Sequence, residues 1–257
     1  VLRWIPFNMG EADLRNRVKN KMIRPTTIPQ LQGELQMEQA IAREALRLAF
    51  EQHKSLAVGL KGVQRVRDIS ETFKEVKEEG LVNMLKLDLL IGSGGVLSHA
   101  PRRPQAMLML IDAFLPEGIT RLGVDSIFMM PHLGVLSSIQ PAAAQEVFEK
   151  DCLVPLGTCL AITNTGRWGE KCLEIKLNYP DGRKTEDSIP FGELRLYALG
   201  PKEEAELEAH PARAFDLGKG KGHALKSRVT GGVVGLVVDT RGRPLNIPKN
   251  NRIELLK

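Results

Sequence analysis

Leu87 to Pro101 reads LDLLIGSGGVLSHAP, and this segment joins three patterns. The apolar run Leu89–Ile91 is too short for an independent helix and stops at Gly92-Ser93-Gly94-Gly95, which predicts a buried strand that enters a tight glycine turn. Pro101 and Pro104 suit the first turn of a helix whose apolar face runs over 106–114. The predicted unit is therefore strand, glycine turn and helix.

This glycine turn has two interpretations. Glycines allow backbone N–H groups to approach a ligand, and a following helix start adds unpaired donors, a combination that suits phosphate or ribose groups. A turn of the same kind also occurs as a purely geometric connection, so the local sequence leaves both interpretations open. Two sharper motifs are excluded, because Val96 and Leu97 follow Gly95 where a dinucleotide fingerprint needs a third glycine, and no Gly-Lys-Ser/Thr is present for a P-loop.

Composition indicates a globular protein that acts in the cytoplasm. The 257 residues are 42% hydrophobic and 26% charged, and they are enough for one large or two ordinary domains. No apolar run approaches the roughly 20 residues of a membrane span, so no membrane partner is expected. The three cysteines lack C-x-x-C spacing, which predicts buried free thiols and no metal site.

The basic residues gather at the two ends of the chain. Residues 1–30 hold 6 Lys/Arg against 2 Asp/Glu, and residues 213–257 hold 10 against 3. Aromatic residues are 5% of the chain, too few for the interleaved basic and aromatic surface of nucleic-acid proteins, so no nucleic-acid partner is expected. The chain begins at Val1 without a methionine, which indicates a fragment or a processed chain.

Periodicity divides the chain near residue 150. We expect helices over 11–21 and 34–52, a strand over 123–130 and a helix opened by Pro141, and then a change to period two beyond Asp151 with a hairpin at Pro180-Asp181-Gly182. The predicted domains are an α/β lobe over 1–150 and a β-rich domain over 151–257. The charged stretch 64–79 is interpreted as a solvated helix face or a mobile insertion, and the arginines of DTRGRP (239–244) as partners in an intermolecular salt bridge.

Two histidines are candidates for lining a pocket at the glycine turn. His132 follows the strand expected over 123–130, and His99 follows the turn itself. Open α/β sheets bind ligands beyond the carboxyl ends of their strands, which is where both are expected. A purely structural role for each histidine stays open.

Four phrases carry a resemblance to a known family. They are NKMIRPTTIP (20–29), EQAIAREALRLAFEQH (38–53), LIGSGGVLSHAPRRP (90–104) and GLVVDTRGRPL (235–245). In this order they resemble the MutL family associated with glutamate mutase, which is unrelated to the mismatch-repair protein of the same name. The resemblance implies the second lobe of an actin-like ATPase fold, followed here by the mostly-β domain, with adenine nucleotide held by Gly92, Ser93, Gly94 and Gly95.

The resemblance also implies a function. Such a protein is an accessory, reactivating and chaperone-like ATPase for an adenosylcobalamin-dependent mutase of the glutamate mutase or aminomutase type, with ATP or ADP and Mg²⁺ bound in the full-length protein and no directly bound cobalamin. No catalytic residue is identified, and the phosphate-loop motif D-x-G-[ST] does not precede Glu34, so its place is expected upstream of Val1. ATPase activity is therefore expected of the full-length protein and not of this chain alone. The alternatives are a small-molecule kinase of the same fold and a non-enzymatic scaffold with a degenerate nucleotide fold.

Overall fold

A computed structural model gives the structure of residues 1–59, 82–247 and 253, so the charged stretch 64–79 lies outside the described residues. The helices and helical turns are η1 (Leu2–Trp4), α1 (Glu11–Ile23), α2 (Gln32–Gly59), η3 (Met84–Lys86), α3 (Gly95–Ser98), α4 (Arg103–Phe114), α5 (Met130–Ser137), α6 (Pro141–Val147) and η4 (Phe148–Cys152). The strands are β1 (Leu89–Gly92), β2 (Gly118–Asp125), β3 (Leu153–Ala161), β4 (Lys171–Asn178), β5 (Lys184–Pro190), β6 (Leu194–Tyr197), β7 (Glu204–Pro211), β8 (Leu225–Thr230) and β9 (Gly235–Asp239).

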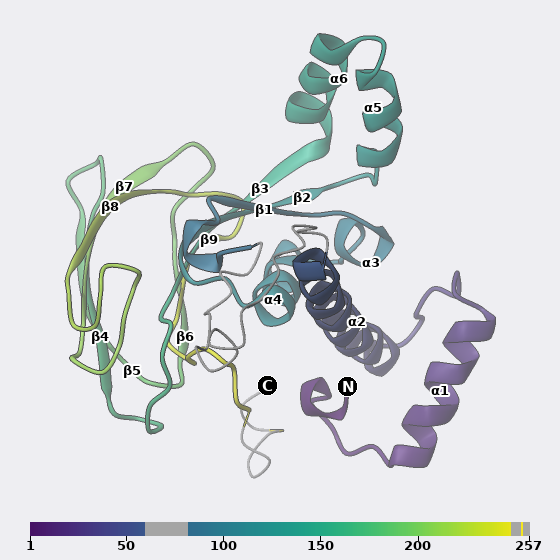
Figure 1. Cartoon of the computed structure of the whole chain (residues 1–257), viewed down its shortest axis with the longest axis horizontal. Coiled ribbons are helices and arrows are strands. Elements are labelled where there is room, and N and C mark those ends of the chain that lie inside the picture. Colours follow the sequence, from purple (N-terminus) through teal and green to yellow (C-terminus); the bar gives the residue numbers. More distant parts are fainter. Residues whose placement is uncertain (60–81, 248–252, 254–257) are drawn as a thin grey trace, which may run out of the picture.

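These strands form two sheets (Figure 1). A five-stranded sheet has the order β1-β2-β3-β9-β6, and a four-stranded sheet has the order β5-β4-β7-β8. The pairs β1–β2 and β3–β9 are parallel, whereas β2–β3 and β6–β9 are antiparallel. The four-stranded sheet is antiparallel throughout. The fold is therefore mixed α/β, as predicted.

The central strands β2, β3 and β9 of the five-stranded sheet are buried on both faces, and an irregularity in the pairing of β2 with β3 at Leu156 places Leu156 and Leu160 on opposite faces. On one face, Leu156 and Val237 belong to a buried cluster with apolar residues of α4, against which α2 packs. On the other face, Leu160 and Val238 belong to a second cluster with the four-stranded sheet. The result is a layered body of helices, central sheet and outer sheet (Figure 1).

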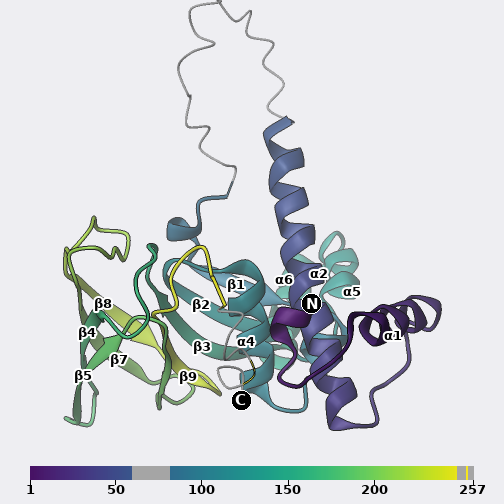
Figure 2. The ribbon, with the colours of Figure 1, turned by 90° about the horizontal axis from the view of Figure 1, so that it is seen from below.

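Among the described residues, α2 is the longest helix. It packs on the side of α4 away from the sheet, and α1 lies on the opposite side of α2 (Figure 1). The 28 residues of α2 span about 42 Å at 1.5 Å per residue, so it runs well past the edge of the sheet (Figure 2). α1 has no buried residue and stands apart from the sheet, and the connector over 24–31 joins it to the start of α2. Both helices were predicted, with α2 extending beyond the expected 34–52.

The predicted boundary at residue 150 lies inside one sheet. β2 comes before it and β3 after it, and these two strands pair over their whole length, from Gly118 opposite Ala161 to Asp125 opposite Leu153. The five-stranded sheet thus takes β1 and β2 from the first part of the chain and β3, β6 and β9 from the second. The outer sheet is formed entirely by residues after 151, in agreement with the predicted change to period two.

Two local expectations are corrected. The strand expected over 123–130 is the last part of β2, which ends at Asp125, and α5 begins at Met130. The glycine turn does not lead directly into the predicted helix, which is α4. The four-residue helix α3 intervenes, and α4 starts at Arg103 with Pro104 in its first turn. The hairpin around Pro180-Asp181-Gly182 is confirmed by the pairing of β4 with β5.

Candidate functional site

The glycine turn lies at the carboxyl end of β1, beside the carboxyl end of β2. The two strands are parallel, and Gly92 of β1 pairs with Val124 of β2. Side chains and backbone groups that follow the two strands therefore meet at one edge of the sheet, which is where open α/β sheets bind ligands. The predicted order of strand and glycine turn is confirmed, but the strand is not buried as predicted, because β1 lies at the edge of the sheet and Leu89 is exposed.

The glycines of the turn divide into two kinds. A Cβ at Gly92 would lie 2.8 Å from a methyl carbon of Leu110 and 2.9 Å from one of Leu97, so Gly92 is required for packing between β1 and the helices. Gly94 has φ +113°, and a Cβ at Gly94 or Gly95 would meet no atom within 4 Å. Gly94 and Gly95 therefore face open space, and only they offer backbone that a ligand can approach closely.

Backbone donors are available at this open part of the turn. The carbonyl oxygen of Gly94 accepts hydrogen bonds from the N–H groups of Leu97 and Ser98. Within the described part of the chain, no hydrogen bond occupies the N–H groups of Gly94 and Gly95 themselves. These two groups suit oxygen atoms of a phosphate or a ribose.

A buried carboxylate that the sequence did not reveal holds the turn in place. Asp125 is the last residue of β2 and is fully shielded from solvent. Its Oδ2 accepts a hydrogen bond of 2.9 Å from the Ser93 hydroxyl and one of 2.8 Å from the backbone N–H of Met130. Its carbonyl oxygen accepts a hydrogen bond of 2.5 Å from the Ser98 hydroxyl. The same residue therefore joins the glycine turn, the helix α3 and the first residue of α5.

The hydrogen bonds keep Asp125 ionised despite its burial. Burial alone would raise the pKa of the Asp125 carboxyl, but hydrogen bonds led by the one from Met130, with a contribution from Ser93, hold that pKa below its usual value. The negative charge of Asp125 is stabilised by hydrogen-bond donors of the same chain.

The two candidate histidines follow β1 and β2 on different helices. His99 is exposed and ends α3, whereas His132 is exposed on α5. Neither makes a hydrogen bond to the glycine turn among the residues that the structure describes. Their expected role as pocket-lining residues stays a prediction.

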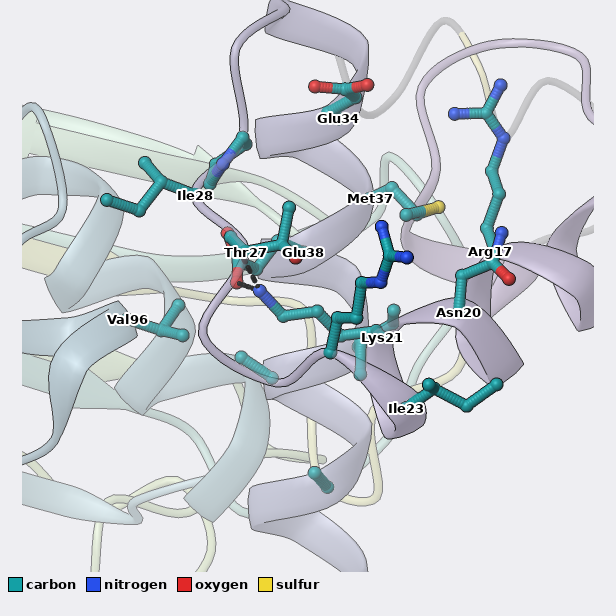
Figure 3. Close-up of a pocket in the computed structure, with 15 residues that line it drawn as sticks. Arg17, Asn20, Lys21, Ile23, Thr27, Ile28, Glu34, Met37, Glu38 and Val96 are labelled. Carbon is teal, nitrogen blue, oxygen red and sulfur yellow. Dashed lines mark hydrogen bonds and ion pairs between the residues drawn. The ribbon is translucent and has the colours of Figure 1, made fainter.

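A cleft of about 720 Å³ lies between α1, the connector and α2 (Figure 3). Its lining is mainly apolar, and it includes Val96 of α3, the residue that follows the glycine turn. Lys21 of α1 extends into it and forms an ion pair of 2.5 Å with Glu38 of α2 and a hydrogen bond of 2.6 Å to the Thr27 carbonyl (Figure 3). Sequence periodicity gave no signal of this cleft, because it depends on how α1 folds back along α2.

At the end of β9, Asp239, Arg241 and Arg243 of the GLVVDTRGRPL segment form a buried ionic network. Arg241 donates two hydrogen bonds of 2.9 Å to the carboxylate of Asp239, and Arg243 donates a third of 3.1 Å. Arg241 also forms an ion pair of 2.9 Å with Oδ1 of Asp112 on α4, and Asp112 accepts a hydrogen bond of 2.8 Å from Arg43 of α2. The contact of Oδ1 lacks hydrogen-bond geometry, since Oδ1 has no hydrogen-bond partner among the described residues.

This network corrects the expectation that these arginines pair with another molecule. Their partners are Asp239 and Asp112 of the same chain, and Asp239 is fully buried. Burial would raise the pKa of Asp239, but the charges of Arg241 and Arg243 hold it far below its usual value. The network ties α2 and α4 to the end of β9.

Two further findings concern metals and membranes. In residues 1–59, 82–247 and 253, no group of three or more His, Cys, Asp or Glu side chains is placed to hold a metal ion. Within the same residues, no helix has the length and apolar character needed to cross a membrane. All three cysteines are buried, as predicted.

The sequence model of a family described as MutL protein matches residues 1–152, which include α1, α2, the glycine turn and Asp125. This chain belongs to the MutL family. The family is the type associated with glutamate mutase, distinct from mismatch-repair MutL. Comparisons with curated proteins and with solved structures found no match. The matched range ends at η4, so most of the strands of the second half lie outside it.

Proposed function

We propose that this MutL-family protein is an accessory factor that reactivates an adenosylcobalamin-dependent mutase of the glutamate mutase or aminomutase type. An adenine nucleotide acts as its switch and binds at Gly94 and Gly95. The observation that carries the proposal is the open backbone of these two glycines at the carboxyl ends of parallel β1 and β2, in a member of a family associated with glutamate mutase.

The hydrogen bonds of Asp125 support the role of a switch. A ligand that binds Gly94 and Gly95 acts next to Ser93, whose hydroxyl bonds Asp125, and the same carboxylate oxygen holds the N–H of Met130. A change in the turn therefore alters the start of α5 through one shared acceptor. Such a connection transmits nucleotide binding only if the nucleotide binds one conformation of the turn more tightly than the other.

The arrangement fits nucleotide contacts without a complete ATPase site. Gly94 and Gly95 offer N–H groups to ribose or α-phosphate oxygens, whereas hydrolysis needs a Mg²⁺-bridged γ-phosphate and a positioned water. We expect this 257-residue chain to bind adenine nucleotide weakly and to hydrolyse no ATP. The small-molecule kinase is the less favoured alternative, because it needs a catalytic aspartate at the site. Asp125 is the aspartate bonded to the glycine turn, and its Oδ2 already accepts two hydrogen bonds from the same chain.

The binding test uses Gly95→Val, because Gly95 has open space beyond its Cβ and no positive φ. The added side chain is accommodated by the protein and occupies the space that the nucleotide needs. Titration with a fluorescent ADP analogue should show at least about tenfold weaker binding than for the unaltered chain. The matched control is Gly10→Val at the start of α1, which also meets no atom within 4 Å and should bind normally.

The functional test measures capture of purified glutamate mutase by the immobilised 257-residue chain with ATP, with ADP and without nucleotide. Nucleotide-dependent capture supports the proposal, whereas equal capture with and without nucleotide favours the non-enzymatic scaffold. Transfer of phosphate to a small molecule favours the kinase. Undiminished nucleotide binding by folded Gly95→Val would move the site away from the turn.

A further inference from the structure

The hairpin formed by α5 and α6 carries an exposed apolar surface that the proposed nucleotide site does not use. The hairpin leaves the five-stranded sheet after β2, returns at β3, and projects away from the rest of the protein (Figure 1). The exposed large apolar side chains on it have between 36% and 76% of their surface in solvent. They are Ile127, Phe128, Met130, Val135, Leu136, Ile139 and Val147.

This surface is not needed to hold the hairpin together. Within the hairpin, Leu133 of α5 and Ala144 of α6 are the buried apolar residues, and Asp125 fixes the start of α5 through the N–H of Met130. The side chains of Val135 and Ile139 are 71% and 76% exposed and add little to folding. An apolar surface of this kind on a projecting element is typical of an interaction site.

The hairpin is also uncharged from Ser126 to Gln145. Residues 126–145 contain no Lys, Arg, Asp or Glu, in a chain that is 26% charged. The first charged residue after them, Glu146, forms an ion pair of 2.5 Å with Lys150, and Glu149 accepts a hydrogen bond of 2.8 Å from Gln145. A partner that meets this surface therefore needs no complementary charge.

We propose that the α5–α6 hairpin is a self-association surface, which packs against the same hairpin of a second copy of this chain. In a twofold dimer each patch meets itself, so any charged group near the axis would face its own like charge. A patch without charges avoids this repulsion. Full burial of all seven side chains would remove roughly 700 Å² of exposed surface per copy, a maximum close to the about 800 Å² per partner of a standard-size interface.

The test is the oligomeric state of the whole 257-residue chain, measured by sedimentation velocity over a wide range of concentration. We expect a concentration-dependent dimer. Val135→Glu and Ile139→Glu should each raise its dissociation constant by about a hundredfold or more, because every dimer would then bury two added carboxylates. The matched control is Met22→Glu on α1, where an equally exposed methionine (76%) lies outside the hairpin and the dimer should persist.

A cross-linking experiment separates this surface from any other dimer contact. Cys152, Cys159 and Cys172 are buried, and burial raises the pKa values of Cys159 and Cys172 to about 12, so an introduced exposed cysteine is the reactive one. Ile139→Cys treated with a short bismaleimide should give a covalent dimer, whereas Met22→Cys should not.

Three results would overturn the proposal. They are a monomer at every concentration, a dimer that survives both glutamate substitutions in folded protein, and cross-linking through Met22→Cys alone. Because none of these measurements uses nucleotide, their failure leaves the proposed function untouched. A monomer that captures the mutase through the hairpin would instead assign the surface to the mutase.

Discussion

Ser93 and Asp125 lie 32 residues apart and are joined by a hydrogen bond of 2.9 Å between the seryl hydroxyl and Oδ2 of the carboxylate. The same Oδ2 accepts the backbone N–H of Met130 at 2.8 Å. One oxygen atom therefore holds the glycine turn and the first residue of α5. Several consequences of this and neighbouring contacts are open to measurement.

Asp125→Asn should destabilise the protein by about 1–3 kcal/mol, because an amide has one acceptor oxygen in place of two and its NH₂ group would face donors in a buried site. Ser93→Ala should cost only about 1 kcal/mol, since the carboxylate keeps its backbone donors. Urea denaturation of both single variants and the double variant measures the coupling between the two residues. Additive effects would show that the hydrogen bond contributes nothing of its own.

Acid should weaken the folded state through Asp125 and Asp239. The pKa of each is lower in the folded protein than in the unfolded chain, so each contributes stability that is complete above the unfolded value of about 3.9 and is lost as the pH falls through the folded value. The free energy of unfolding, measured by urea titration at successive pH values, should therefore fall below about pH 4. Asp125→Asn should show a shallower fall than the unaltered protein, and an equal slope would contradict the lowered pKa of Asp125.

Arg241→Ala should destabilise the protein by about 3–5 kcal/mol, because it removes the main partner of the fully buried Asp239 and leaves Oδ1 of Asp112 without its ion pair. The matched control is Arg228→Ala, which breaks an exposed pair with Glu204 at 3.5 Å on the outer sheet and should cost no more than about 0.5 kcal/mol. Thermal unfolding followed by circular dichroism compares the two. Similar costs at both positions would mean that burial does not determine the contribution of the network.

Gly92→Ala should cost about 1–3 kcal/mol, since its Cβ would overlap side-chain atoms of Leu97 and Leu110. Gly95→Ala should stay within about 0.5 kcal/mol of the unaltered chain, because its Cβ enters open space without a positive φ. The midpoints of urea denaturation decide between them. Equal sensitivity at the two positions would remove the distinction between a packing glycine and a glycine open to ligand.

Residues 151–257 expressed alone should be less stable than the whole chain. Removal of β2 leaves β3 without its antiparallel partner, and removal of α4 exposes the apolar face that includes Leu156 and Val237. The outer sheet and its buried cluster remain within the piece, so we expect β-rich structure by circular dichroism with a lower melting temperature and a tendency to aggregate. A piece as stable as the whole chain would instead support the predicted independent domain.

The elements of the fold with local signals were predictable from sequence. The apolar run before Gly92 identified β1, and the Pro180-Asp181-Gly182 turn identified the β4–β5 hairpin. β7 has a weaker signal, because only Ala205, Leu207 and Ala209 form the buried positions that alternate with its charged residues. The strand expected over 123–130 was placed too late, because apolar residues continue past the point where Asp125 ends the pairing.

The candidate site was predictable only in part. Its glycines are visible as a run, but the role of Asp125 depends on β1 and β2 being parallel neighbours, which no residue spacing states. The arginines of DTRGRP were recognisable as a charged turn, yet their partner Asp112 lies on a helix more than a hundred residues earlier. Such pairings exist only after the layers of the protein have packed together.

The hairpin α5–α6 leaves and rejoins the sheet between two strands that are already paired, with Asp125 opposite Leu153 at the point of departure. Its 27 intervening residues, 126–152, could be exchanged for a tight turn that keeps the ladder between β2 and β3, provided that the turn offers Asp125 a backbone N–H in place of that of Met130. The hairpin is therefore an insertion between two strands that pair without it. The sequence of the hairpin can therefore vary widely without redesign of the sheet, as long as one backbone donor to Asp125 is kept.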